Sequence, residues 1–202
     1  MRKLQHHIYH IMTVLIAGFV LVGCSTTHAP RKSVTSPQTG LHLPDRVQFL
    51  QTDKRWAHHT LGGSNESLRT DGCLVTASAM ALVNLGFRTD PGDLAYRLKA
   101  YDGFNKRGWM VWSGLEKATS GIAKTVFDDR KDDGAVRACL AAGYYPLVRF
   151  NLKSSQTHWA VVINEGKNGF NIRDPMVNSR TPIPLSSRTN TIDAVRCIGV
   201  RA

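Results

Sequence analysis

The chain has 202 residues and a formal net charge of +11, from 26 Lys and Arg residues against 15 Asp and Glu residues. A net charge this positive favours anionic partners such as lipid head groups, lipopolysaccharide or cell-wall polymers. The basic residues are scattered and no DNA- or RNA-binding motif is present, so we expect no nucleic-acid partner.

The N-terminal residues have the pattern of an export signal. Arg2 and Lys3 precede an apolar run at residues 11–22, which is shorter than the roughly 20 residues that a membrane-spanning helix needs. The run ends in Leu-Val-Gly-Cys at residues 21–24, which resembles the lipobox of bacterial lipoproteins. In that family the signal is cleaved before the cysteine. We therefore expect a lipoprotein signal peptide over residues 1–23.

Cys24 would then be the first residue of the mature protein and would carry a lipid that anchors it to the membrane. Ser25 follows it, which by resemblance to Gram-negative sorting indicates the outer membrane, facing the periplasm. Removal of Arg2 and Lys3 with the signal leaves a net charge of +9 (11 minus 2). The alternative is an ordinary secretory signal cut near Ala29, with the cysteine incidental.

A polar segment connects the signal to the rest of the chain. Residues 24–44 contain three prolines and no period of 2 or 3.6, which predicts a flexible tether. Residues 45–202 are one domain's worth of chain, long enough to bury a sizeable core. We expect this domain to be a monomer.

Four helices are predicted in the first part of the domain. The first begins at Asp71 or Gly72, is apolar on nearly every face and ends near residue 85, so we expect it to be buried. The others are predicted over about residues 91–101, 112–119 and 134–142.

Four strands are predicted after the helices. Residues 145–152, 158–164, 169–173 and about 194–200 are rich in β-branched and aromatic side chains. Turn residues at 164–169 predict a hairpin between the second and third strands. Helices followed by an antiparallel sheet define an α+β fold.

Three cysteines remain once Cys24 is assigned to the lipid. In an oxidising compartment an odd number allows one internal disulfide and leaves one thiol. Cys139 and Cys197 are both flanked by core residues, and a disulfide between them would leave Cys73 free. Two buried, unpaired thiols are an equally ordinary alternative.

Cys73 is placed where a thiol can act as a nucleophile. It lies at the start of the predicted buried helix, and a helix N-terminus favours the thiolate. Gly72 before it would let a substrate backbone approach closely. Asp71 would raise the thiol pKa if it faced the sulfur, and we expect it to point into the helix cap instead. The ordinary alternative for the cysteine is core packing.

A histidine and an aspartate follow in an order that suits a base and its orienting group. His158 begins the most apolar strand, and Asp174 ends the next one, before a proline. The two face each other if the hairpin turn centres on Gly166. If the turn centres on Asn168, they are out of register by roughly 6 to 7 Å, and we expect the pair to fail. A structural histidine and an Asx turn are the alternatives.

A glutamine precedes Cys73 at a distance that suits an oxyanion donor. Gln51 lies 22 positions before it, and a side-chain amide beside the nucleophile can stabilise a tetrahedral intermediate. Gln48 competes for the same role.

These motifs together resemble one family. In chain order they are Gln51 with Asp53 and Trp56, Gly72-Cys73 with Thr76, Ala79 and Met80, His158-Trp159 with Val161-Val162, and Asp174-Pro175. Their combination resembles the papain-like cysteine peptidases related to the peptidase domain of bacteriocin-processing transporters. The resemblance implies a papain-like α+β fold, in which a buried helix carrying the cysteine packs on an antiparallel sheet carrying the histidine and the aspartate.

The resemblance also implies a role for each residue. Cys73 would be the nucleophile, His158 the general base and acid, and Asp174 the group that orients the imidazole. Gln51 and the Cys73 backbone N–H would bind the oxyanion. Transporter domains read Asp-Cys-Gly at the nucleophile, whereas this chain reads Asp-Gly-Cys-Leu at 71–74 and has no transmembrane bundle or P-loop. Removal of double-glycine leaders is therefore not implied.

The leading functional hypothesis is an envelope-anchored cysteine peptidase that hydrolyses a peptide or isopeptide bond of an envelope peptide or protein. A cell-wall (peptidoglycan) endopeptidase similar to the NlpC type is the second, although that family usually has a second histidine in the place of Asp174. The third is a catalytically inactive papain-like binding module. No metal-ligand spacing occurs, so we expect no metal and no cofactor. Trp109, Trp112 and Tyr101 line either a substrate cleft or an aromatic core.

Overall fold

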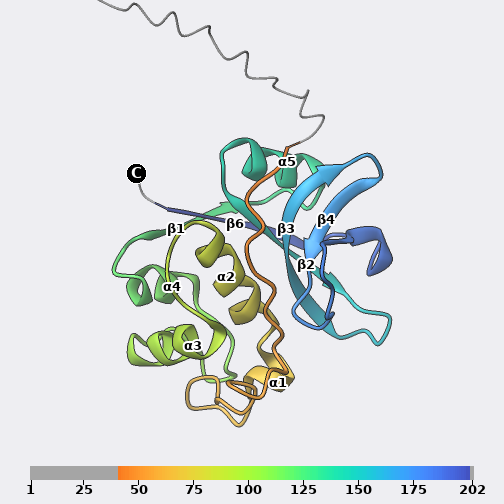
Figure 1. Cartoon of the computed structure of the whole chain (residues 1–202). Coiled ribbons are helices and arrows are strands. Elements are labelled where there is room, and N and C mark those ends of the chain that lie inside the picture. The colour runs from red at the N-terminus through yellow and green to blue at the C-terminus, as the bar shows by residue number, and fades with distance from the viewer. Residues whose placement is uncertain (1–40, 201–202) are drawn as a thin grey trace, which may run out of the picture. The chain divides into compact units, whose positions relative to one another are not determined.

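The structure of the protein is a computed structural model that describes residues 41–200 (Figure 1). The predicted signal peptide, Cys24 and all but the last four residues of the predicted tether lie outside the described residues. Within residues 41–200, no helix is both long enough and apolar enough to cross a membrane.

The four predicted helices are present, within two residues of their expected ends. The helices are α1 (Leu68–Asp71), α2 (Cys73–Asn84), α3 (Pro91–Ala100), α4 (Trp112–Ala118) and α5 (Asp133–Ala141). Only α1, a single turn before α2, was not predicted. Asp90 caps the start of α3, since its carboxylate accepts a hydrogen bond from the Asp93 N–H at 2.8 Å.

A six-stranded, fully antiparallel sheet forms the centre of the fold, in the order β1-β6-β2-β3-β4-β5. The strands are β1 (Ala123–Asp128), β2 (Tyr145–Asn151), β3 (Thr157–Gly166), β4 (Gly169–Arg173), β5 (Ile183–Pro184) and β6 (Ala194–Val200). The four central strands are those predicted. The two edge strands were missed, so the prediction that the whole sheet follows the helices is wrong: β1 lies between α4 and α5. It is half-exposed and pairs only with β6, the last strand of the described residues.

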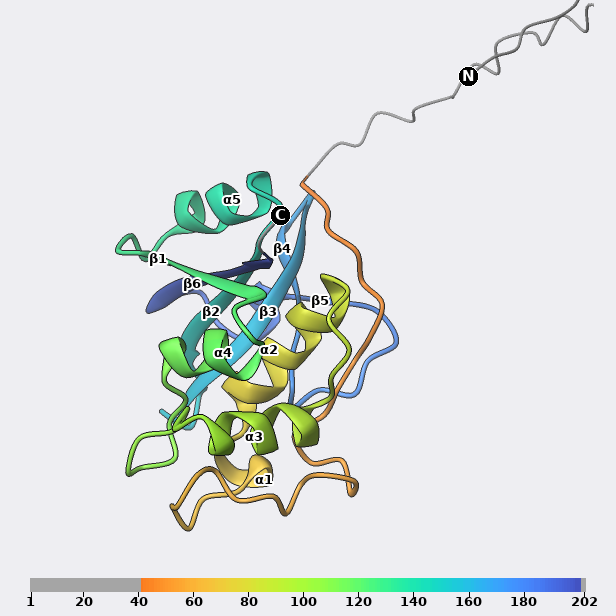
Figure 2. The ribbon, with the colours of Figure 1, turned by 90° about the vertical axis from the view of Figure 1, so that its left-hand side faces the viewer.

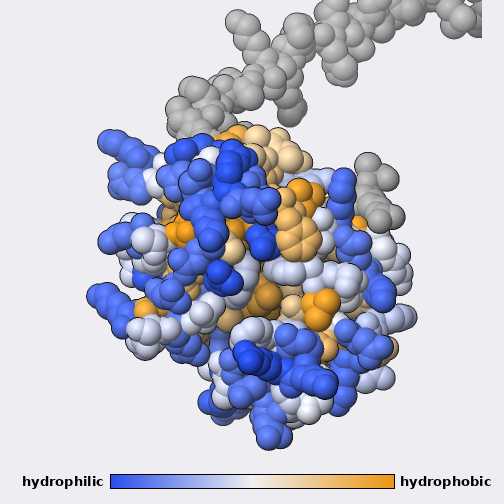
Figure 3. All heavy atoms as spheres, turned by 180° about the vertical axis from the view of Figure 1, so that it is seen from behind, coloured by the Kyte–Doolittle hydropathy of each residue, from blue (hydrophilic) through white to orange (hydrophobic). Residues whose placement is uncertain are grey.

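The sheet is buried on both faces, by different helices. Along β3, Val161 and Ile163 belong to the core beneath α2, α3 and α4, while Ala160 and Val162 belong to the core beneath α5. This alternation is the period of a strand. Figure 2 shows α5 on the opposite side of the sheet from α2 and α4. The face in Figure 3 is mainly hydrophilic, with separate hydrophobic patches.

The first described residues lie against the sheet. The Leu43 N–H donates to the Ile163 carbonyl at 3.0 Å, and the Glu165 N–H donates to the Leu41 carbonyl at 2.9 Å. Leu43 also packs against the core. Residues 41–44 are therefore packed against the domain predicted over residues 45–202.

Cys139 of α5 and Cys197 of β6 form a disulfide, with their Cα atoms 5.6 Å apart, and Cys73 is the one free cysteine among residues 41–200. The disulfide ties α5 to the strand that pairs with both β1 and β2.

Replacing both Cys139 and Cys197 by Ala should lower the free energy of unfolding by about 4 kcal/mol, because the bridge closes a loop of 58 residues in the unfolded chain. Urea denaturation of the oxidised protein and of the double variant measures the difference. Cys73→Ala is the matched control, since that cysteine closes no loop. A difference below about 1 kcal/mol would show that the bridge does not constrain the unfolded chain as this loop length requires.

Candidate active site

Cys73 is the first residue of α2, half-buried and unpaired. The helix is covered almost completely, as predicted, and most of its buried residues are small, which lets it approach the sheet closely. Gly72 is required for a reason other than the expected one. A Cβ at that position would overlap backbone atoms of Leu68, so the glycine allows α1 and α2 to pack at their junction.

Asp71 does not cap α2, contrary to the prediction, because no side chain caps this helix. Its carboxyl instead lies near Glu66. Partial burial, followed by the hydrogen bond and charge of Glu66, raises the pKa of Asp71, while a hydrogen bond with Thr70 opposes the shift.

His158 and Asp174 meet in the interior. The His158 Nε2 lies 2.8 Å from the Asp174 Oδ1, and the two residues are only 2% and 1% exposed. The imidazole packs against the Phe150 ring, with the centroids 5.4 Å apart. Burial among apolar groups strengthens this polar contact, because water does not compete for it.

A β-bulge puts these two side chains on the same face of the sheet. The turn of the β3–β4 hairpin lies between Gly166 and Gly169, so it does not centre on Gly166. The register then shifts by one residue between Val162 and Asn164. Without this bulge, the pairing of β4 with β3 would place Asp174 opposite an odd-numbered residue of β3. Its side chain would then lie on the other face of the sheet from His158. With the bulge, the aspartate continues opposite residue 160.

The observed register is therefore neither of the two considered from the sequence. His158 and Asp174 are diagonal neighbours, and diagonal positions on one face are about 7 to 8 Å apart, within reach of these side chains.

The Cys73 side chain lies close enough to the His158 ring to affect its pKa. Since Nε2 faces Asp174, the thiol is left with Nδ1. Burial by itself lowers the pKa of His158, but the hydrogen bond to Asp174, the neighbouring Cys73 side chain and the charge of Asp174 outweigh it and raise the pKa to about 9. The imidazole can therefore accept and hold a proton at neutral pH.

Asp174 is held by two further donors. Its Oδ1 accepts the Met176 N–H at 2.7 Å, and its Oδ2 accepts the Arg188 Nε at 2.7 Å. Burial opposes ionisation of Asp174, but the hydrogen bond and charge of His158, the Met176 N–H and the charge of Arg188 together lower its pKa. Arg188 follows the short 3-10 helix Leu185–Ser187. Sequence reasoning missed it, because it lies in a polar segment without a periodic pattern.

The two candidate glutamines have different contacts. The Gln48 Nε2 donates to the Asp174 carbonyl at 2.9 Å, so Gln48 helps to hold the backbone of the aspartate. The buried Gln51 donates its Nε2 to the Arg69 carbonyl at 2.8 Å, in the turn just before Cys73. Its Oε1 has no partner among residues 41–200. Gln51, not Gln48, therefore lies on the nucleophile side.

A cleft of about 340 Å³ lies beside Cys73. Its walls come from the first turn of α2, from residues 108–112 and from residues 156–159 at the start of β3. Trp109, Trp112 and Trp159 line it, whereas Tyr101 lines a different, open hollow. Of the three aromatic residues considered from the sequence, two therefore belong to the cleft.

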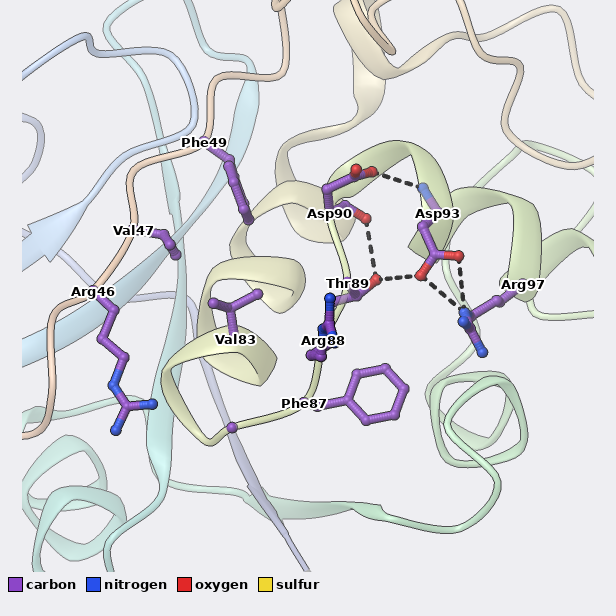
Figure 4. Close-up of a pocket in the computed structure, with 11 residues that line it drawn as sticks. Arg46, Val47, Phe49, Val83, Phe87, Arg88, Thr89, Asp90, Asp93 and Arg97 are labelled. Atoms are coloured by element: carbon purple, nitrogen blue, oxygen red, sulfur yellow. Dashed lines mark hydrogen bonds and ion pairs between the residues drawn. The ribbon is translucent and has the colours of Figure 1, made fainter.

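A second, larger hollow lies elsewhere. It measures about 750 Å³ and surrounds the C-terminal end of α2 (Figure 4). Figure 4 labels its lining residues, among them Arg46, Phe87, Arg88 and Arg97, and none of these belongs to the Cys73 cleft. Within residues 41–200, no group of three or more His, Cys, Asp and Glu side chains is arranged to hold a metal ion.

Comparison with known proteins identifies the fold. No family model and no curated protein matches the sequence. Among solved structures, the chain is similar to the crystal structure of a candidate C39-like peptidase from Bacillus anthracis, with a TM-score of 0.52 and 16% identity, over 80% of this chain and 98% of that one. A likeness at this identity establishes the fold alone. The chain therefore has a cysteine-peptidase-like fold, as the sequence resemblance implied.

Proposed function

We propose that the protein is a cysteine peptidase that hydrolyses a peptide or isopeptide bond through Cys73, His158 and Asp174. The observation that supports this proposal is the buried His158–Asp174 contact, together with the influence of the one free thiol of the described residues, Cys73, on the pKa of the same imidazole. In this arrangement Cys73 would be the nucleophile, His158 its base and Asp174 the group that orients the base.

The first half of the proposed reaction acylates Cys73. Its thiol proton passes to His158, and the sulfur attacks the carbonyl carbon of the scissile bond. The oxyanion that forms receives hydrogen bonds from the Gln51 amide and the Cys73 backbone N–H. The tetrahedral intermediate then collapses: the C–N bond breaks, the leaving amine takes the proton from His158, and a thioester remains.

The second half releases the acyl group. A water molecule gives a proton to His158 as its oxygen attacks the thioester carbonyl, the C–S bond breaks, and the proton returns to the Cys73 sulfur. Asp174 holds the imidazole orientation throughout and stabilises its cationic form. Every proton is moved by side chains of this chain, so the proposed reaction requires no cofactor.

We further propose that the enzyme acts in the bacterial envelope, on a peptide or protein substrate. Cleavage before Cys24 and lipidation of that residue would anchor it to the outer membrane, facing the periplasm, through the segment that precedes residue 41. The net positive charge would hold the domain close to anionic surfaces. The aromatic walls of the cleft also suit the glycopeptides of the cell wall, so peptidoglycan hydrolysis is the second candidate activity.

A neutral peptidyl chloromethyl ketone tests the proposal. We expect it to alkylate Cys73 at least about tenfold faster in the folded protein than in urea, because only the folded chain brings His158 to the sulfur. Intact mass and peptide mapping identify the site. The disulfide protects Cys139 and Cys197, so among residues 41–200 Cys73 is the thiol on which the label should appear. Equal rates in folded and unfolded protein would favour an inactive binding module.

A further inference from the structure

The floor of the Cys73 cleft is the sheet face beneath α2, continued past the end of the helix. On β2, Tyr145 and Leu147 lie in the core on this face, and Arg149 is the next residue on the same side. On β3, Val161 lies in the core and Trp159 follows it on the same side, directly opposite Arg149. Arg149 is thus the residue of β2 at which the apolar core beneath α2 ends and the cleft begins.

Arg149 has no carboxylate partner among the described residues. Its one polar side-chain contact is a long bond from Nη2 to the Asp193 carbonyl, at 3.5 Å. The Asp193 carboxylate accepts a hydrogen bond from Asn151 instead, at 3.0 Å. Asp71 at the rim of the cleft is exposed and forms no ion pair with Arg149 within residues 41–200. The half-buried Arg149 side chain therefore borders the cleft without an ion-pair partner among the described residues, and it also borders a second hollow that Asp128, Asp129 and Asp193 line.

A second arginine, Arg196, adds positive charge next to Arg149. Arg196 of β6 lies opposite Leu147 on the same face, and its guanidinium stacks 4.8 Å from the Phe127 ring centroid. Its buried Nε has no partner among residues 41–200. Burial, followed by the charge of Arg149, lowers the pKa of Arg196, whereas Asp129 opposes the shift. Two neighbouring cations are thus incompletely neutralised beside a cleft with aromatic walls.

We propose that Arg149 is a specificity-determining residue that binds a carboxylate of the substrate, from an acidic side chain or from a free C-terminus. A planar guanidinium matches a carboxylate with two parallel hydrogen bonds. Trp112 and Trp159, with ring centroids 5.8 Å apart, hold apolar surface beside it and weaken competition from water. This inference rests on the proposed function, since it assigns the substrate class of the Cys73 cleft.

Disulfide exchange at Cys73 tests the inference without requiring catalysis. Matched alkyl disulfides that end in a carboxylate or in a carboxamide, with chains of two to six carbons, compete for the thiol under mild reductant, and intact mass measures the two adducts. We expect the carboxylate to be preferred by about tenfold at the best chain length, and the preference to disappear in Arg149→Gln. Arg149→Lys should keep part of it. Arg88→Gln, the same change outside the cleft, should keep all of it.

Two peptide disulfides then identify the source of the carboxylate, one with Glu and a C-terminal amide, the other with Gln and a free C-terminus. Equal capture of carboxylate and carboxamide, or a preference that survives Arg149→Gln, would overturn the inference. Absence of any adduct would overturn the inference as well, because it would show that these disulfides cannot reach the Cys73 sulfur through the cleft. Failure of the proposed function looks different: the carboxylate preference would be present, but the chloromethyl ketone would react no faster in the folded protein.

Discussion

A Cys73→Ala chain is expected to lose at least about 10⁴-fold in hydrolysis, because no other group can form the acyl intermediate. The loss should not come from unfolding. Cys73 is half-buried at the N-terminus of α2 and makes no disulfide, so removal of its sulfur leaves the core of the domain in place. A library of internally quenched peptides and purified peptidoglycan are the substrates, with new N-termini and released muropeptides measured by mass spectrometry.

His158→Ala should cause a loss of similar size, since residues that act as a unit are not additive. His58→Ala is the matched control: it makes the same change at an exposed histidine outside the cleft, and full activity is expected. Urea denaturation checks that each variant is folded. Hydrolysis that survives in Cys73→Ala would show that the thiol is not the nucleophile and would contradict the proposed mechanism.

Asp174→Asn is expected to lower hydrolysis by about 10²- to 10⁴-fold and to move its alkaline limit to lower pH. The leaving amine needs the proton of His158, so in the wild type hydrolysis should fall as pH rises through about 9, where that proton is lost. The hydrogen bond that His158 donates to Asp174 is the largest influence that raises this pKa. The neutral amide would remove the negative charge and place an NH₂ group against a donor, either Arg188 or His158.

Arg188→Gln tests the effect of the Arg188 charge on Asp174 while Asp174 itself is kept. Arg188 helps to lower the pKa of Asp174, so its loss should move the acid limit of hydrolysis to higher pH, while the alkaline limit stays near 9 or rises. Arg188→Lys should restore the wild-type acid limit. The measurement is kcat/KM against pH for each variant. An Asp174→Asn profile that is lower but unchanged in shape would show that the aspartate does not set the protonation of His158.

Much of the fold was predictable because its signals are local. The apolar run after Cys73, the Asp-Pro start of α3 and the β-branched runs of the four central strands each carry their own pattern, and the structure has these elements within about two residues of the predicted ends. The edge strands β1 and β5 were not predictable in this way. β1 is half-exposed, β5 is only Ile183–Pro184, and both are strands because a neighbour supplies the hydrogen bonds.

The sequence by itself determined the α+β class and the four residues on which the proposed mechanism rests, because residue type and order carry that information. Only the tertiary structure decided how they meet. One extra residue in β3 turns Asp174 to the face of His158, and hydrogen bonds place Gln48 behind the aspartate and Gln51 near Cys73. Arg149 and Arg188 look like any other scattered arginines in the sequence. Their roles depend on which face and which carboxylate they meet, and long-range packing sets both.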